Sequence, residues 1–368
     1  MPGMASGREV ETTTIHIADM DRRHFLKAGS LAIAATATCG TAAAANHQNT
    51  QDSQLRLRPS ETKSPNLQGA PADAEPLPHP AAWSSETGGA TDADLHVRFL
   101  GTGAADWNGP DSRGEHRRLT SVLLDGRILI DFTATDADML PKGMSAEAVF
   151  YTHSHEDHYN AEAELTHIGA PVVYVSETWV QRAEEGFAKA AAKTGSDSPK
   201  VVPLKTGQKV TLSDIAITAL PANHSTADAE EQTLIYLIEK RDVRILYATD
   251  TGGIVSRAAR LASIDAHTKG APISGLIMEA TMGIDYDEDF RIFTHSSVGL
   301  VKRTADVLLT TGRLVPPSGQ PVYLTHMART LHGTQADLDA CLPMPLRAAY
   351  DGLEVVFRAG EVTSSSNL

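Results

Sequence analysis

The sequence predicts an α/β protein built as a sandwich of β-rich layers with helices on the outside. Two observations indicate this class. Segments of β character gather in two blocks, at residues 94–132 and 201–247, and helical segments follow each block. Hydrophobic residues make up 41% of the 368 positions, which is enough for a substantial core.

The first block is expected to be antiparallel, because Asp125-Gly126 is a strong tight-turn pair between two apolar runs. Apolar alternation predicts its strands, and an Ala-rich stretch after it predicts a helix. The expected elements are strands at 94–100, 119–124, 127–132 and 146–151, a helix from about residue 160, a strand at 171–175 and a helix at 177–193.

The second block and the C-terminal part continue the alternation of strands and helices. The turn-like triplet at 240–242 separates two strands of this block. The expected elements are strands at 201–204, 209–220, 233–239 and 243–247, a helix at 254–266, a strand at 275–279, a helix at 296–309, a strand at 321–324, a helix at 334–340 and a closing strand at 353–358.

The N-terminal segment, residues 1–45, resembles a bacterial twin-arginine export signal. Arg22-Arg23 is followed by Phe25-Leu26-Lys27 and by a weakly apolar, uncharged run at 28–45. The resemblance implies recognition by the twin-arginine export machinery and a periplasmic or secreted location. The alternative is a short amphipathic or membrane helix, but the run is too poor in Leu, Ile and Val for a stable membrane span.

Residues 46–92 are expected to form a flexible linker, because they are rich in Pro, Ser, Gln and Asp, and residues 93–362 to form one folded domain. The net charge of −14 disfavours a nucleic-acid partner, which normally requires a basic face. The chain has only two cysteines, Cys39 and Cys341, so a disulfide framework and a Cys-ligated metal site are excluded.

One stretch places four side chains of the metal-ligating types within six residues, directly after the strand expected at 146–151. In an extended backbone His153 and His155 point the same way, and Asp157 with His158 can turn toward a neighbouring point. The cluster could therefore feed two metal ions. The alternative is a solvated His-rich loop, but three adjacent imidazoles would repel one another on protonation unless something bound them.

Three further candidate ligands, His224, Asp250 and His326, each follow a predicted strand. Taken singly, each could be a capping aspartate or a surface histidine, but their recurrence at strand ends favours a shared site. The Gly101-Thr102-Gly103 sequence lacks the third glycine of a dinucleotide-binding loop, so it predicts a turn beside the active site instead.

The order His-x-His-x-Asp-His, followed by a distant His, Asp and His, resembles the metallo-β-lactamase superfamily over roughly residues 94–360. Four segments are similar to its ribonuclease Z and cyclic-phosphodiesterase branch: F-L-G-T-G-A-A-D at 99–106, P-A-N-H at 221–224, Y-A-T-D-T-G at 247–252 and Y-L-T-H at 323–326. The resemblance implies a four-layer αββα sandwich. It also implies one ion held by His153, His155 and His224, a second held by Asp157, His158 and His326, and Asp250 as the bridge between them.

Two ions held in this way would share a hydroxide as nucleophile and stabilise charge on the substrate, with Asp157 serving as both ligand and catalytic residue. Zinc is the first choice, and manganese or iron also suit nitrogen and oxygen ligands. His295 is interpreted as a general acid or phosphate-oxygen donor assisted by the following helix N-terminus, or else as a capping residue. Glu279 either orients a ligand or is a structural carboxylate. Met278 stands where ribonuclease Z has a His.

The resemblance therefore implies an exported dinuclear metal-dependent hydrolase whose substrates are small molecules, namely small or cyclic phosphodiesters. The alternatives are hydrolysis of an ester, sulfate ester, lactone or lactam by the same ions, and a non-enzymatic, metal-binding exported protein. Transfer-RNA processing fits the acidic charge less well. A homodimer is compatible with the sequence. Glu230 and Glu231, which follow His224 closely, are expected in a solvated loop.

Overall fold

The structure, a computed structural model, describes residues 91–268 and 270–360, which contain two seven-stranded sheets. The predicted export signal at 1–45 and all but the last two residues of the predicted linker at 46–92 lie outside the described residues. Both therefore remain predictions. In the described part of the chain, no helix combines the length and the apolar character needed to cross a membrane.

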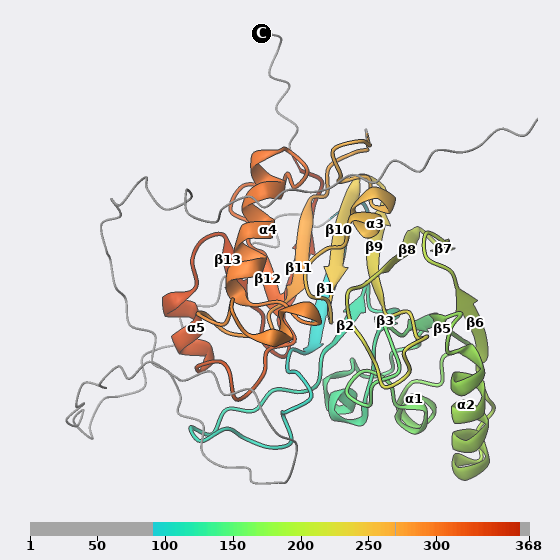
Figure 1. The fold of residues 1–368 in the computed structure, drawn as a ribbon. Coiled ribbons are helices and arrows are strands. Elements are labelled where there is room, and N and C mark those ends of the chain that lie inside the picture. The colour runs from blue at the N-terminus through green and yellow to red at the C-terminus, as the bar shows by residue number, and fades with distance from the viewer. Residues whose placement is uncertain (1–90, 269, 361–368) are drawn as a thin grey trace, which may run out of the picture. The chain divides into compact units, whose positions relative to one another are not determined.

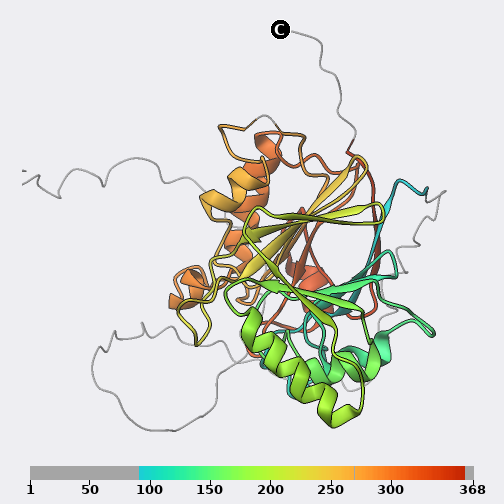
Figure 2. The same cartoon turned by 90° about the vertical axis from the view of Figure 1, so that its right-hand side faces the viewer.

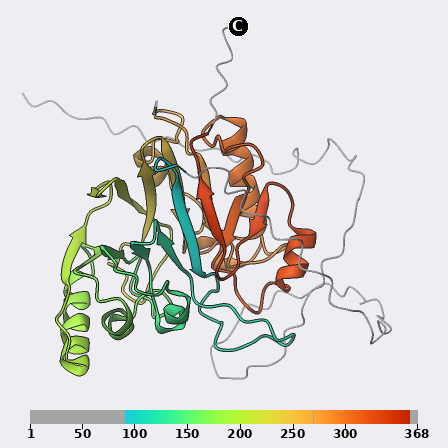
Figure 3. The same cartoon turned by 180° about the vertical axis from the view of Figure 1, so that it is seen from behind.

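The first sheet has the strand order β14-β1-β2-β3-β4-β5-β6. Strands β1 to β3 run antiparallel, as the Asp125-Gly126 turn predicts, whereas β3 to β6 run parallel. Strand β14 pairs with β1, so the two ends of the described chain lie side by side (Figure 3). The strands are β1 (Leu95–Gly101), β2 (Ser121–Leu124), β3 (Ile128–Ile130), β4 (Ala148–Phe150), β5 (Val172–Ser176), β6 (Lys200–Leu204) and β14 (Glu354–Phe357).

The second sheet has the strand order β13-β12-β11-β10-β9-β8-β7, antiparallel from β7 to β10 and parallel from β10 to β13. The single strand expected at 209–220 is wrong: Ser213 adopts a φ of +51° and turns the chain, so this segment forms a hairpin. The strands are β7 (Lys209–Leu212), β8 (Ile215–Pro221), β9 (Leu234–Lys240), β10 (Val243–Ala248), β11 (Gly275–Glu279), β12 (Val322–Thr325) and the unpredicted β13 (Leu346–Ala348).

Helices cover the outer faces of both sheets (Figures 1 and 2). One apolar cluster lies between the first sheet and the helices α1 and α2, and another lies between the second sheet and α3, α4 and α5. The helix expected at 254–266 is shorter than predicted. The helices are α1 (Ala161–His167), α2 (Val180–Thr194), α3 (Ser256–Leu261), α4 (Val298–Thr310) and α5 (Gln335–Cys341), with 3-10 helices η1 (Ala134–Met139) and η2 (Phe290–Phe293). The predicted αββα sandwich is confirmed.

The two sheets pack face to face through a third apolar cluster, to which Phe150 of β4 and Tyr236 of β9 both contribute. Two hydrogen bonds join the sheets at one edge of this core. The Tyr236 hydroxyl donates to the Tyr151 carbonyl at 2.7 Å, and the Leu234 amide donates to the Thr152 carbonyl at 2.9 Å. These bonds fix the chain immediately before His153 against the second sheet.

Glu164 of α1 has a buried carboxyl group beside the apolar cluster that lies between the first sheet and helices α1 and α2. Its Oε1 accepts a hydrogen bond from the Ala170 amide at 2.8 Å, whereas its Oε2 has no hydrogen-bond partner among the described residues. Burial raises the pKa of Glu164 to about 7, against the smaller opposing effect of the Ala170 amide. Ionisation of this group therefore destabilises the folded state.

We expect Glu164→Gln to stabilise the protein above neutral pH. The folded-state pKa of about 7 exceeds the ordinary value of 4.5, so the stability that protonated Glu164 contributes is complete below pH 4.5 and is lost as the pH rises through 7. The variant should therefore gain up to about 3 kcal/mol in free energy of unfolding at about pH 9 and little at about pH 5.

Urea unfolding at the two pH values measures this difference. Glu162→Gln, an exposed position on the same helix, is the matched control and should show no such pH dependence. An equal gain for Glu164→Gln at both pH values would contradict the assignment.

Candidate metal centre

All seven predicted ligands come to one edge of the sandwich from strand ends. The His153–His158 segment follows β4 of the first sheet, while His224, Asp250 and His326 follow β8, β10 and β12 of the second. Asp250 and His326 have left-handed backbones, with φ of +47° and +52°. Such a conformation is uncommon outside glycine, and residues that adopt it cluster at functional sites. It turns the chain sharply after the strand.

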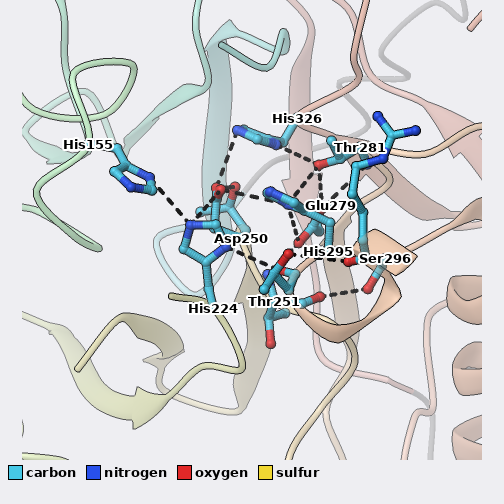
Figure 4. Close-up of polar contacts among 12 residues, drawn as sticks. His155, His224, Asp250, Thr251, Glu279, Thr281, His295, Ser296 and His326 are labelled. Carbon is cyan, nitrogen blue, oxygen red and sulfur yellow. Dashed lines mark hydrogen bonds and ion pairs between the residues drawn. The ribbon is translucent and has the colours of Figure 1, made fainter. Parts of the chain in front are cut away.

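The first group of donors consists of His153, His155 and His224, whose ligand atoms lie within 4.8 Å of one another. His153 Nε2 lies 2.8 Å from His155 Nδ1. His155 Nδ1 in turn lies 3.3 Å from His224 Nε2 (Figure 4). This is the set that the sequence assigns to one ion. The structure brings its three members together although His224 is remote in sequence.

The second group consists of Asp157, His158 and His326, which also lie within 4.8 Å of one another. His158 Nε2 and His326 Nε2 are 3.2 Å apart, and each lies 3.4 Å from Asp157 Oδ2. This set matches the ligands that the sequence assigns to the other ion.

Asp250 lies between the two groups and presents a different oxygen to each. Its Oδ2 lies 3.0 Å from His158 Nε2 and 3.3 Å from His326 Nε2, while its Oδ1 lies 3.8 Å from His224 Nε2. The side chain is almost fully buried, and Thr249 donates a hydrogen bond to Oδ2 at 2.9 Å. The carboxylate has the placement that a bridging ligand requires.

The outward-facing nitrogens of these histidines are already engaged, which fits metal binding. His158 Nδ1 lies 2.8 Å from Asp131 Oδ2, and His224 Nδ1 lies 3.0 Å from the Thr294 carbonyl. Both partners accept hydrogen bonds, so each Nδ1 carries a proton and each Nε2 is the nitrogen directed inward. Ligand atoms arranged tetrahedrally about 2.1 Å from an ion lie about 3.4 Å apart, close to the spacings found here.

The two groups differ in electrostatic character. Burial lowers the pKa of His153 well below its usual value, and nearby His158 lowers it further, so His153 is neutral as a ligand must be. Burial also lowers the pKa of His155. In the second group burial lowers the pKa of His158, but Asp250, Asp157 and Asp131 together raise it well above its usual value. The second group therefore favours a cation more strongly.

Asp131 is a site residue that the sequence analysis missed. It follows β3, is fully buried with a φ of +58°, and accepts hydrogen bonds from the Thr152 amide and hydroxyl in addition to its contact with His158. Its position at the end of an apolar strand is the same pattern that identified His224, Asp250 and His326. Asp131 was not identified because residues 127–132 were predicted to form one strand, which placed it inside the strand.

His295 and Glu279 form a pair beside the two groups (Figure 4). His295 Nδ1 lies 3.1 Å from Glu279 Oε2 and 3.2 Å from Thr281 Oγ1, and Thr281 Oγ1 also lies 2.8 Å from His326 Nδ1. Burial lowers the pKa of His295, but the charge and hydrogen bond of Glu279 raise it to about 9. Glu279 thus orients His295 directly and reaches His326 through Thr281.

The start of helix α4 differs from the expectation that it would assist anion binding next to His295. The N-cap is Ser297, whose hydroxyl accepts the Leu300 amide and donates to the Asp287 carboxylate. That carboxylate lies so close to Gly299 that it would clash with a β-carbon there. Asp287 therefore supplies negative charge at the helix start, which disfavours a further anion.

The expectation of a solvated loop holds for Glu230, which is exposed, but is wrong for Glu231, whose side chain is fully buried. The turn predicted at Gly101-Thr102-Gly103 does lie beside the site. Gly103 pairs with Met327, the residue after His326.

Known proteins share features of this sequence and of its fold. The family model described as "Beta-lactamase superfamily domain" matches residues 127–308. The structure is similar to a diphosphatase from the PhnP family, with 18% identity and a TM-score of 0.51 over 73% of this chain and 98% of that one. It is also similar to the metallo-β-lactamase-fold protein YhfI from Bacillus subtilis, with 14% identity and a TM-score of 0.51 over 72% of this chain and 99% of that one. A third similar structure is human tRNase Z, short form, with 15% identity and a TM-score of 0.50 over 72% of this chain and 99% of that one. Among curated proteins the sequence has no significant match.

Asp131→Asn and Asp250→Asn should distinguish a residue that contacts one donor group directly from a residue that contacts both. Asp131 contacts His158 of the second group directly and reaches His153 only through Thr152, so its loss should weaken one ion about 10- to 100-fold and affect the other less. Asp250 faces both groups, so Asp250→Asn should weaken both ions. Competitive chelator titration with Zn²⁺ counts the ions and their affinities; retention of two tightly bound ions in Asp250→Asn would refute the bridge.

Proposed function

We propose that this chain is a metal-dependent hydrolase of the metallo-β-lactamase superfamily and that it cleaves small or cyclic phosphodiesters with two metal ions. One observation carries the proposal. Two three-residue donor groups share the Asp250 carboxylate, and the His295–Glu279 pair lies beside them. This arrangement combines sites for two cations with a separate group that can deliver a proton.

The donor set suits divalent ions bound by nitrogen and oxygen, with zinc the first choice and manganese or iron also suited. When bound, two such ions supply an activated water at neutral pH and positive charge for the substrate oxygens. The chain's own contribution is to direct the imidazoles inward and, by burial, to hold His153 neutral. Asp157 and Asp250 provide the negative charge that retains cations in a buried place.

His295 is the proposed general acid. Its Nδ1 is held by Glu279, so its Nε2 is the nitrogen left to face a substrate, and its ring lies against His224 on one side and His326 on the other. As water attacks phosphorus and the bond to the leaving oxygen breaks, His295 gives its proton to that oxygen. Glu279 stabilises the protonated imidazole before the transfer.

Two of the similar structures are a diphosphatase and a tRNase Z, which agrees with hydrolysis at phosphorus. At 18% and 15% identity they support the fold, so the substrate class in this proposal depends on the site itself. The net charge of −14 argues for a small substrate over a polynucleotide. Export is a further part of the proposal, motivated by Arg22-Arg23 and the run at 28–45.

Metal removal should abolish hydrolysis, and two equivalents of Zn²⁺ or Mn²⁺ should restore it. We expect turnover of bis-p-nitrophenyl phosphate and of a cyclic phosphodiester to exceed turnover of a lactone and a chromogenic lactam. Rates for the four substrates before chelation, after chelation and after reloading provide the measurement. Activity that survives complete chelation would rule out the metal-dependent mechanism, and a preference for the lactone or lactam would rule out the phosphodiesterase.

His295→Ala should lower kcat by about 10²- to 10⁴-fold for a diester with an alkyl leaving group, because that oxygen needs a proton as it leaves. The loss should be much smaller for p-nitrophenolate, which leaves readily as an anion. Metal content should be unchanged, and His167→Ala, at an exposed position of α1, is the control. Equal losses for both leaving groups would remove His295 from the acid role.

A further inference from the structure

Glu231 is a buried carboxylate between two segments that carry metal-site histidines. It belongs to the loop between β8 and β9, which begins just before His224. Its Oε1 accepts the Ser154 amide at 2.8 Å, and its Oε2 accepts the Ser154 hydroxyl at 2.7 Å and the Thr226 hydroxyl at 3.1 Å. Arg182 of α2 also donates to Oε2.

The positions of these donors in the chain give the contacts their significance. Ser154 is the residue between His153 and His155, and Thr226 is two residues after His224. One carboxylate therefore ties together the two segments that provide the first donor group. These contacts reach the second donor group only through the shared segment 153–158.

Burying this charge is costly unless it is neutralised and fully hydrogen-bonded. The side chain of Glu231 is fully buried, and that of Arg182 is 47% exposed, so the ion pair lies at the edge of the protein. Arg182 also lies over the Trp179 ring, with its guanidinium carbon 5.9 Å from the ring centroid. A carboxylate that accepts four hydrogen bonds is a rigid connection, because displacing it would leave several polar groups unpaired.

We propose that Glu231 is a positioning residue that sets the spacing of His153, His155 and His224 for one metal ion. The hydrogen bonds of Glu231 to Ser154, Thr226 and Arg182 do not involve Asp131 or Thr281, which engage His158 and His326 of the second group. Loss of Glu231 should therefore affect the two ions unequally. The inference rests on the metal centre of the proposed function and does not depend on the substrate.

Glu231→Gln tests the proposal because the amide keeps the shape of the side chain but loses its charge and directs an NH₂ group toward donors. Competitive chelator titration with Zn²⁺ should show one ion bound as in the wild type and the other about 10- to 100-fold more weakly. Imidazole ¹H–¹⁵N spectra identify the affected group: signals of His155 and His224 should change, and that of His326 should not.

Two further variants make the test decisive. Glu230→Gln, at the adjacent exposed position, should bind both ions normally. Thr226→Val removes the hydroxyl that joins Glu231 to the His224 segment, together with its local contacts to the Asp228 backbone, and leaves the contacts between Glu231 and Ser154. It should weaken the same ion by a smaller factor, so it decides the matter if Glu231→Gln does not fold. Unchanged affinities in both test variants, or equal weakening of both ions, would overturn the positioning role.

This result is separable from that of the proposed function. Metal binding as expected without phosphodiester turnover would overturn the proposed substrate and leave the role of Glu231 standing. Wild-type protein that binds no ions would overturn both.

Discussion

The face-to-face packing of the two sheets is the contact on which the rest of this structure depends, because the candidate ligands are divided between them. His153, His155, Asp157 and His158 follow a strand of the first sheet, and His224, Asp250 and His326 follow strands of the second. Neither sheet alone can assemble either donor group. The apolar core between the sheets therefore brings the two halves of each donor group together as well as stabilising the fold. The Tyr236–Tyr151 hydrogen bond joins the sheets close to His153.

A layer of buried polar groups converts this approximate convergence into defined geometry. Asp131, the Thr294 carbonyl and Thr281 each engage the outward nitrogen of one histidine, so that the inward nitrogens are fixed in direction. The two donor groups are unlike each other: one consists of imidazoles, whereas the other includes Asp157. Ions bound in the two groups would therefore differ in affinity, with the acidic group the stronger.

The carboxylates around the site divide into distinct tasks. Asp157 and Asp250 belong to the donor groups, Glu279 contacts His295, and Glu231 connects two loops. Burying a carboxylate costs free energy unless it is hydrogen-bonded or paired with a positive charge, and each of these groups has such partners. The same principle explains Glu164, which lacks a second partner and whose pKa is raised to about 7. Similar chemical groups thus act as ligands, orienting groups or a source of instability according to what surrounds them.

The sequence by itself determined the sandwich and the seven ligand candidates. Apolar periodicity defines the strands, the dense His-x-His-x-Asp-His run follows one of them, and the other three candidates each follow another. Local signals failed where a turn was inconspicuous: Ser213 interrupts an apolar run, and Asp131 ends another. Only the tertiary structure decided that these donors lie close together, that Glu231 is buried, and that Asp287 lies at the α4 N-terminus. Those facts arise from contacts between residues far apart in the chain, and periodicity carries no information about such contacts.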